Sequence, residues 1–382
     1  RSIQPGAAPA AVLQVLPSLR GGGVERSTVE ITAALAANGF VPHVASEGGR
    51  LVAEIERLGG RHHRLLLASK NPFRILANAG HLAALIRAHG IALIHARSRA
   101  PAWSAFLAAR RTGIPFVTTC HGIYGTGLPG KHAYNAVMAR GDRVIANSEF
   151  MARHLAATYG LDDARLRVIP RGVDPAVFDP GAIAPDRTAA LARAWGLPEG
   201  APVLLLPGRI SALKGQDVLV RALARLRHGT AVAVLIGEPK TRDRFGPRLA
   251  ALAAGLGLGD RLRWPGHCAD MPAALRLADL VLSTSVEPEA FGRTIVEAQA
   301  MGRPVIASAH GGALETIAAG ETGFLVPPGD PAALAAAIDA GLDLDAAARA
   351  ALGARARAAV LGRYTVGAMQ QATLAVYAEL LG

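Results

Sequence analysis

Short apolar runs rich in β-branched residues alternate along the first half of the chain with longer runs of helical periodicity. The first apolar run, Ala11 to Leu19, predicts a strand that turns through three glycines into a helix from Val24 to Asn38. Further strands are predicted at Val41 to Ser46, His62 to Leu67, Ile91 to Ala96, Pro115 to Cys120 and Arg143 to Asn147. This alternation predicts a parallel sheet with helices on both faces.

The same alternation begins again after a connector that contains Pro180, Pro185 and Pro198. The predicted strands are Pro202 to Pro207, Ala231 to Ile236, Leu262 to Pro265, Leu280 to Ser285, Pro304 to Ser308 and Gly323 to Val326. The predicted helices are Gly215 to Arg227, Arg242 to Leu256 and the tail from Pro331 onward. The fold class is therefore α/β, with two doubly wound Rossmann-like domains over residues 1–175 and 176–382. Ligands of such sheets bind at the carboxyl ends of strands, so two facing sheets would form a cleft.

Composition agrees with this architecture and indicates the kind of cellular compartment in which the protein works. A chain of 382 residues is expected to form two domains, and its 51% hydrophobic residues include few aromatic ones. Cys120 and Cys268 form no C-x-x-C pair, so we expect free thiols in a reducing compartment. No apolar run approaches the roughly 20 residues of a transmembrane helix. The start, RSIQPGAAPA, has no stretch suited to a signal peptide and is expected to be a loose lead-in. We expect a soluble protein or one on a membrane surface.

Positive charge is concentrated in the first half of the chain. Residues 1–175 contain 21 Lys and Arg against 10 Asp and Glu, whereas the remaining residues contain 20 against 19. A positive field of this kind attracts anionic lipid, phosphorylated glycan or nucleic acid. The alternative is an arginine-rich composition from a GC-rich genome, with the charges simply solvated.

The most informative stretch for chemistry is STSVEPEAFGRTIVEAQAMG, from Ser283 to Gly302. A strand passes through an acidic loop into a helix, with Glu289 before the helix and Glu297 inside it. The start of a helix offers free N–H groups and a positive dipole end, which suit an anion. The two carboxylates would repel a bare phosphate. They suit a ligand that carries hydroxyl groups beside its phosphate, as a nucleotide-sugar does.

Two cations are predicted at the corresponding place earlier in the second domain. In LLLPGRISALKGQDVL, Arg209 leaves the end of a strand and Lys214 stands at the start of the next helix. Such cations stabilise charge that grows on a departing phosphate, although two solvated loop cations would give the same pattern. In the first domain, Gly22 and Gly23 follow the first strand and would let a ligand approach the backbone closely. They form neither a dinucleotide fingerprint nor a Walker loop.

His121 ends the strand PFVTTCHG, where it could hydrogen-bond a substrate hydroxyl; His95 and His310 compete for this role. The D-x-D at Asp343 and Asp345 opens a helix, so N-capping explains it better than metal binding. No cluster of Cys and His suggests a metal site.

These motifs together resemble a known family. The motifs, in chain order, are GGGVER, CHG, NSEF, RGVD, GRISALKG, EPEAFGRTIVEAQAMGRPVIAS, GGALE and TGFLVPPGD. This ordered set is similar to that of the retaining GT-B glycosyltransferases called "glycosyl transferases group 1", the fourth family of glycosyltransferases. The resemblance covers nearly the whole chain in order. Its most specific parts are the E-x7-E element with an internal Phe-Gly and the G-R-x4-K-G element.

The resemblance implies a role for each matching residue. Arg209 and Lys214 would bind the donor diphosphate, Glu289 would hold hydroxyls of the donor sugar, and Glu297 would hold ribose hydroxyls. The remaining matches are the sugar-contacting loop at Phe291 and Gly292, the base-proximal loop at Gly266 and His267, the glycine loop at Gly22 and Gly23, and His121 near the reacting sugar. Such enzymes need no metal cofactor, and their C-terminal helices cross back to the first domain.

The residue types also indicate a route for the transfer. No strong nucleophile stands beside a base, so a front-face reaction fits better than double displacement. The diphosphate would depart towards Arg209 and Lys214, the acceptor hydroxyl would attack the same face, and the departing oxygen would take its proton. Uridine and guanosine donors both fit.

The resemblance implies that the first domain receives the acceptor, and here that domain carries nearly all the net positive charge. We therefore expect an anionic or lipid-linked glycan, such as a lipopolysaccharide core, and a cytoplasmic enzyme in peripheral contact with the inner face of a bacterial membrane. A small soluble sugar, sugar phosphate or inositol phosphate is the first alternative, and a nucleotide-sugar epimerase is the second. Nucleic acid is not expected as a partner, because no recognised binding module is present.

Overall fold

The chain folds into two compact units, each built around its own parallel sheet. The computed structural model describes residues 9–125, 129–239 and 244–382. The first unit comprises Arg1–Arg171 together with Val366–Gly382, and the second comprises Gly172–Thr365. The lead-in predicted at the start of the chain falls mainly on residues 1–8, which lie outside the described residues.

The sheet of the first unit has seven described strands in the order β3-β2-β1-β4-β5-β6-β7. All of its strand pairs are parallel. The strands are β1 (Ala11–Val15), β2 (Val41–Ser46), β3 (Arg61–Arg64), β4 (Ile91–Ala96), β5 (Phe116–Cys120), β6 (Arg143–Ala146) and β7 (Leu166–Val168). The strand order reverses between β1 and β4, which makes the carboxyl ends of these two strands the expected ligand site.

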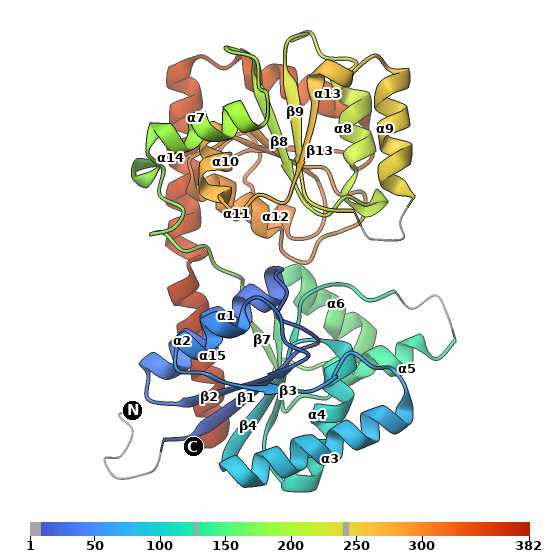
Figure 1. Cartoon of the computed structure of the whole chain (residues 1–382), viewed down its shortest axis with the longest axis vertical. Coiled ribbons are helices and arrows are strands. Elements are labelled where there is room, and N and C mark those ends of the chain that lie inside the picture. Colours follow the sequence, from blue (N-terminus) through green and yellow to red (C-terminus); the bar gives the residue numbers. More distant parts are fainter. Residues whose placement is uncertain (1–8, 126–128, 240–243) are drawn as a thin grey trace. The chain divides into compact units, whose positions relative to one another are not determined.

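Helices cover both faces of this sheet (Figure 1). They are α1 (Gly23–Ala37), α2 (Val52–Arg57), α3 (Pro72–His89), α4 (Arg99–Thr112), α5 (Lys131–Asn135), α6 (Glu149–Tyr159) and α15 (Val366–Leu381). The limits of α3 follow from its sequence. Asn71 caps the first turn through Phe73 N and Arg74 N, Pro72 occupies the first helical position, and Gly90 ends the helix in the left-handed conformation.

The last helix, α15, packs into the first unit, although it follows the second unit in sequence (Figure 1). Its fully buried Tyr377 meets His95 at the end of β4, with 2.6 Å between the hydroxyl and Nδ1. The predicted return of the C-terminal helices to the first domain is thus observed for α15. The predicted division between residues 175 and 176 placed the whole tail in the second domain, whereas α15 belongs to the first unit. The reason is that the apolar face of α15 is buried against β1, β4, β5 and β6.

The sheet of the second unit has six described strands in the order β10-β9-β8-β11-β12-β13. Its strands are β8 (Val203–Pro207), β9 (Val232–Ile236), β10 (Leu262–Gly266), β11 (Leu280–Ser283), β12 (Val305–Ser308) and β13 (Phe324–Val326). Its helices are α7 (Pro185–Ala194), α8 (Gln216–Leu223), α9 (Phe245–Gly255), α10 (Met271–Leu277), α11 (Arg293–Ala300), α12 (Ala313–Thr316), α13 (Pro331–Asp343) and α14 (Ala346–Arg363).

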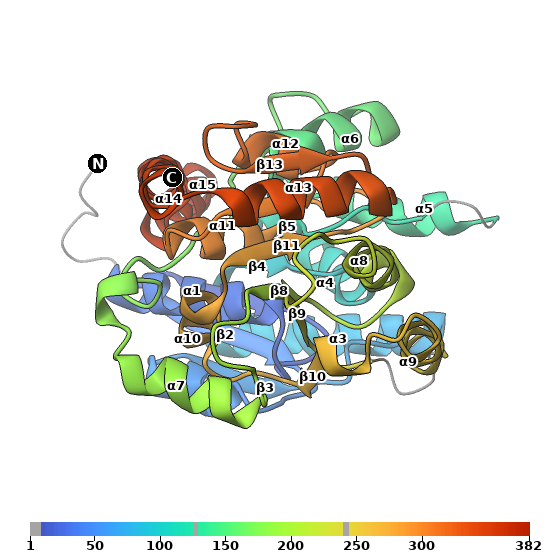
Figure 2. The same ribbon diagram turned by 90° about the horizontal axis from the view of Figure 1, so that it is seen from above.

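Two apolar clusters lie on opposite faces of this second sheet. One joins the sheet to α8, α9 and α13, which are all labelled in Figure 2. The other joins it to α10, α11 and α14. The order again reverses, here between β8 and β11, so the expected ligand site lies where these strands end.

The predicted class of fold is confirmed, and several boundaries are corrected. The first strand ends at Val15 and not at Leu19, because Pro17 cannot donate a ladder hydrogen bond. The predicted connector contains α7, since Pro185 begins a helix as readily as it interrupts one. The short strand β7 was not predicted. Residues 242 and 243 of the predicted helix Arg242 to Leu256 lie outside the described residues.

Candidate active site

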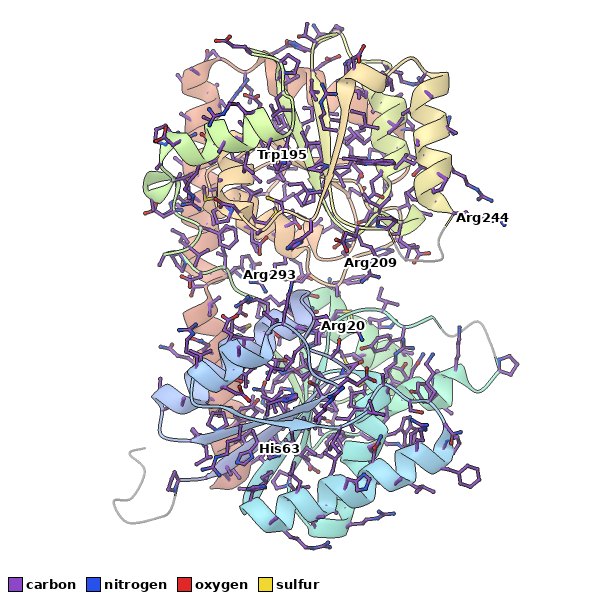
Figure 3. All side chains as sticks on the ribbon, viewed as in Figure 1. Arg20, His63, Trp195, Arg209, Arg244 and Arg293 are labelled. Atoms are coloured by element: carbon purple, nitrogen blue, oxygen red, sulfur yellow. The ribbon has the colours of Figure 1, made fainter. Side chains whose placement is uncertain are left out.

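The loop that follows β8 carries the two predicted phosphate-binding cations. Arg209 lies just after the strand with an exposed side chain (Figure 3), and Lys214 lies at the end of the loop. The buried side chain of Gln216 supports the loop from inside. Its Nε2 donates to Arg209 O at 2.9 Å, and its Oε1 accepts from Ser211 N at 3.3 Å. Both cations therefore stand on a loop with internal hydrogen-bond support.

A close backbone approach joins this loop to the end of β11. Thr284 Oγ1 donates to the carbonyl oxygens of Lys214 and Gly215 at 2.9 and 3.0 Å. Gly215 has a φ of +65°, and a Cβ there would overlap Thr284 O. Glycine is required at this position for both its conformation and its small size. The two loops at the point where strand order reverses are therefore held together.

Lys214 and Glu289 form an ion pair at this junction, with 2.7 Å between Nζ and Oε1. Ser285 Oγ donates to the same carboxylate oxygen. Burial alone would raise the pKa of Glu289, but the charge of Lys214 and the hydrogen bonds from Lys214 and Ser285 outweigh it and lower the pKa. Glu289 is therefore a partly exposed, ionised carboxylate with a cation beside it.

The segment after β12 fixes the backbone on which Glu289 stands. Gly312 N donates to Glu289 O at 2.9 Å, and His310 Nε2 donates to Ser285 O at 2.8 Å. A Cβ on Gly311 would overlap Glu289 O, and one on Gly312 would lie 2.5 Å from Phe291 Cα. The paired glycines thus allow two loops to pack backbone against backbone. A small cavity lies among Ser283, Ser285, Glu289, Gly292, Ile295, Ser308, His310 and Ala313.

Phe291 and Gly292, the predicted sugar-contacting pair, have different structural roles. The Phe291 side chain is buried and packs edge-on against Tyr364, with 5.5 Å between ring centroids. Gly292 has a φ of +82° and begins α11. The side chain of Phe291 therefore anchors the loop, which leaves its backbone as the part that could meet a ligand.

The remaining residues predicted to bind the sugar donor lie in two places, Glu297 in α11 and the Gly266–His267 pair at the end of the edge strand β10. Glu297 lies in α11, as predicted, and its Oε1 accepts from Arg293 Nε at 2.8 Å (Arg293 is labelled in Figure 3). Gly266 ends β10 and its carbonyl accepts from Gly237 N at 2.9 Å; His267 follows it. The structure brings Lys214 and Glu289 into contact, whereas Gly266 and His267 stand two strands away from β8 in the sheet order.

Gly22, Gly23 and His121 belong to the first unit, where Arg171 contacts both Gly23 and His121. Arg171 Nη1 donates to Gly23 O, and its Nη2 donates to His121 Nδ1 at 2.7 Å. His121 Nε2 is buried in a small polar cavity with Arg97 and Asn147. Both ring nitrogens of the predicted catalytic histidine therefore face other protein groups.

The competing histidines have structural contacts. His95 is fully buried between Tyr377 and Thr119, 2.6 and 2.7 Å from their hydroxyl oxygens. His310 holds the Ser285 carbonyl, as described above. In the D-x-D pair, Asp345 caps α14, as predicted, by accepting from Ala348 N. Asp343 pairs with Arg227 and His228. Among the described residues, no group of three or more His, Cys, Asp or Glu is placed to hold a metal ion.

Several supporting residues were not predicted from the sequence. Ser285, Gln216, Gly311, Gly312 and Arg171 all contact a predicted site residue or its backbone. The motifs GGALE and RGVD contain three of them, but neither motif indicated which partner its residues would meet. Taken together, the second-unit cluster offers a cation, an ionised carboxylate, a hydroxyl and the start of a helix around one strand end, which are the groups needed to bind a phosphate ester with adjacent hydroxyls.

This arrangement of two doubly wound units, with charged groups at the strand ends, is that of the GT-B glycosyltransferases. The model for "Glycosyltransferase Family 4" matches residues 21–177, and the model for "Glycosyl transferases group 1" matches residues 188–359. A crystal structure of a glycosyltransferase from Rickettsia africae is 37% identical, covers 98% of this chain and 99% of its own, and superposes with a TM-score of 0.90. The chain belongs to the "Glycosyl transferases group 1" family, so the predicted family and its GT-B fold are confirmed.

Two further relatives bear on the ligands. The structure of Anabaena Alr3699/HepE in complex with UDP-glucose is 26% identical over 97% of this chain and 100% of its own, with a TM-score of 0.85. A D-inositol 3-phosphate glycosyltransferase of Catenulispora acidiphila is 37% identical over 68% of this chain and 66% of its own length. The matched stretches span less than two thirds of the first curated relatives, at 66%, 55% and 58% of their lengths. A search of the described helices finds none with the length and apolar character needed to cross a membrane.

Proposed function

We propose that the protein transfers a hexosyl unit from a nucleoside-diphosphate sugar to a hydroxyl group of a phosphorylated acceptor. The observation that carries this proposal is the contact between Lys214 and Glu289 where β8 and β11 end. A cation for the diphosphate and a carboxylate for the sugar hydroxyls stand side by side at the place where this class of sheet binds ligands. The UDP-glucose complex of the Anabaena relative supports a uridine donor.

In this proposal Glu289 binds the sugar and does not attack it. Lys214 and Ser285 both contact Oε1, which leaves Oε2 to accept from a sugar hydroxyl. A carboxylate whose charge is already shared with an ammonium group is a weak nucleophile. The reaction then retains the anomeric configuration by a front-face route. The bond from the anomeric carbon to the phosphate oxygen breaks, the acceptor oxygen bonds to that carbon, and the acceptor proton passes to the departing phosphate.

The negative charge that grows on the departing diphosphate would be stabilised by Lys214, Arg209 and the N–H groups at the start of α11. These groups supply fixed positive charge, so the reaction would need no metal ion. Glu297, beside the same helix start, would accept hydrogen bonds from the ribose hydroxyls. The fixed backbone around Gly312 would hold the sugar-binding loop in position.

For the acceptor, the relatives favour a small phosphorylated polyol over a lipopolysaccharide core, because three curated relatives that are 37–41% identical are named D-inositol 3-phosphate glycosyltransferases. An excess of 11 positive charges in residues 1–175 is compatible with a phosphate on the acceptor.

A second candidate acceptor is an anionic or lipid-linked glycan at the inner face of a bacterial membrane. The first turns of α3 and the segment before it favour it, because apolar and basic side chains are exposed together there. Phe73 is 83% exposed, Leu66 is 54% exposed and Leu76 is 49% exposed, with Lys70 and Arg74 exposed between them. Apolar and cationic groups on one surface suit an anionic lipid interface.

The test is a transfer assay with UDP- and GDP-hexoses, with and without EDTA, using inositol phosphate and a lipid-linked glycan as acceptors. The expected result is metal-independent transfer to one acceptor, with the product anomer matching the donor, and loss of turnover in Lys214→Ala. Arg248→Ala, which removes an exposed cation on α9, is the matched control. Conversion of the donor to its epimer without any acceptor would replace the transferase proposal with an epimerase. An unaffected Lys214→Ala enzyme would refute the assigned site.

A further inference from the structure

The contact between Arg171 and His121 determines where the imidazole carries its proton. Arg171 Nη2 lies 2.7 Å from His121 Nδ1. A guanidinium group has hydrogen-bond donors and no acceptor, so Nδ1 must accept in this contact. A neutral imidazole that accepts at Nδ1 carries its proton at Nε2. The geometry therefore selects one of the two neutral tautomers.

The groups around His121 also keep it neutral. Burial, followed by the positive charges of Arg171 and Arg97 and by His95, holds the pKa of His121 well below its ordinary value. Nε2 lies in the polar cavity together with Arg97 Nη2 and Asn147 Oδ1, and none of these three buried atoms has a partner among the described residues. The side chains of Arg97 and Asn147 are each 3% exposed. The residues that carry the Nε2 donor and this amide oxygen thus line the same small cavity.

The same guanidinium reaches the glycine loop. Arg171 Nη1 donates to Gly23 O at the start of α1. A Cβ on Gly23 would lie 3.0 Å from Arg171 Nη1, so the absence of a side chain at residue 23 makes room for the arginine. Arg171 is itself only 7% exposed. One buried side chain therefore joins the loop after β1 to the loop after β5.

We propose that Arg171 is a positioning residue, which holds His121 as the neutral Nε2–H tautomer and fixes it to the glycine loop. For the transfer reaction this rests on the proposed function. Because Nδ1 is occupied by a cationic donor and Nε2 already carries a proton, His121 cannot accept the proton of the acceptor hydroxyl. The departing phosphate oxygen is then the group that takes it, and His121 serves only as a fixed hydrogen-bond donor.

The direct test is nitrogen-15 NMR of the full-length protein labelled at histidine, with the His121 signals assigned by their loss in His121→Gln. The wild type should show a single Nε2–H tautomer whose nitrogen shifts do not titrate between about pH 5 and 8. In Arg171→Met the tautomer preference should be lost and the pKa of His121 should rise, because one of the positive charges that lower it is removed. Arg171→Lys, which keeps a cationic donor, should restore much of the wild-type pattern, and Arg111→Met, an exposed arginine of the same unit, should not change it. A wild-type signal for Nδ1–H, or a titration of His121 near its ordinary pKa, would overturn the proposal.

The kinetic arm separates this proposal from the proposed function. Arg171→Met should lower kcat by roughly 10-fold or more, because the Nε2–H donor of His121 would no longer be held in place and a misplacement of about 1 Å can cost about 10²-fold. Calorimetric binding of UDP alone should remain. Unchanged kinetics in Arg171→Met, with an altered tautomer, would refute the positioning role. If the wild type transfers no sugar, the proposed function fails, while the NMR spectrum of the wild type, assigned through His121→Gln, still decides the tautomer.

Discussion

Gly312→Ala tests whether the packing behind Glu289 matters for activity. Gly312 has φ −66° and ψ −17°, which alanine adopts without strain, so the change acts through space alone. Its new Cβ would lie 2.5 Å from Phe291 Cα and 2.6 Å from Phe291 O. Carbon atoms prefer separations of about 3.5–4.0 Å, so the loop of residues 289–292 must retreat by about 1 Å.

The size of the effect follows from that displacement. A misplacement of about 1 Å at a reacting centre can cost about 10²-fold in rate, which is the expected loss in kcat/KM for the sugar donor. Overpacking of this kind typically costs about 1–3 kcal/mol of folding free energy. For a unit of this size, that corresponds to a Tm lower by a few degrees, at about 2–4 °C per kcal/mol.

The assay is initial-rate kinetics with thermal unfolding measured on the same preparations. Gly362→Ala is the matched control, because a Cβ there meets nothing within 4 Å and the residue lies in a helix, α14. The control should keep wild-type kinetics and gain slightly in stability, since alanine is the better helix former. Wild-type turnover in a folded Gly312→Ala enzyme would refute the assigned role of this loop.

Three further predictions follow from single contacts. Burial, followed by the charge of His63, lowers the pKa of His43 from 6.5 to about 4. As the pH falls, the unfolded chain therefore binds this proton before the folded protein does, so the free energy of unfolding should be highest above pH 6.5 and fall until about pH 4. Urea unfolding measured across this range should show the fall, and His43→Gln should reduce it. Lys214→Ala should lower kcat by about 10²–10³-fold with little change in Tm, because it removes the charge that we propose stabilises the leaving group. A large fall in Tm alongside the fall in kcat would contradict this. EDTA should leave turnover unchanged, and turnover that falls with the chelator would show a metal requirement. Asp343→Ala, which changes the D-x-D pair and removes only surface ion pairs, should stay active.

The sequence predicted the two parallel sheets because their buried strands are continuous apolar runs, which periodicity detects directly. It missed β7 because Leu166–Val168 is a three-residue strand of partly exposed residues. It overextended the first strand because Leu16 and Leu19 are buried like strand residues, although they lie in the loop after Val15. The pattern records burial, and burial continues beyond the end of a strand.

For the site, the sequence indicated which residues carry charge and which loops end at the same sheet edge. It could not predict that Lys214 contacts Glu289, which lies 75 residues later, or that Arg171 contacts His121, 50 residues earlier. Such pairs depend on strand order and on the exact path of each loop. The motif GGALE, which carries the resemblance, contains the supporting glycines Gly311 and Gly312. The structure shows which backbone segment each glycine packs against.

The proposed function requires the second unit to bind a nucleoside-diphosphate sugar through Lys214, Glu289 and Glu297. The most direct measurement is a calorimetric titration of the protein with UDP and GDP, with and without Mg²⁺, repeated on Glu297→Ala. We expect saturable binding of one nucleotide that does not depend on Mg²⁺ and is weakened when the Glu297 carboxylate is removed. No binding of either nucleotide, or binding that Glu297→Ala leaves unchanged, would contradict it.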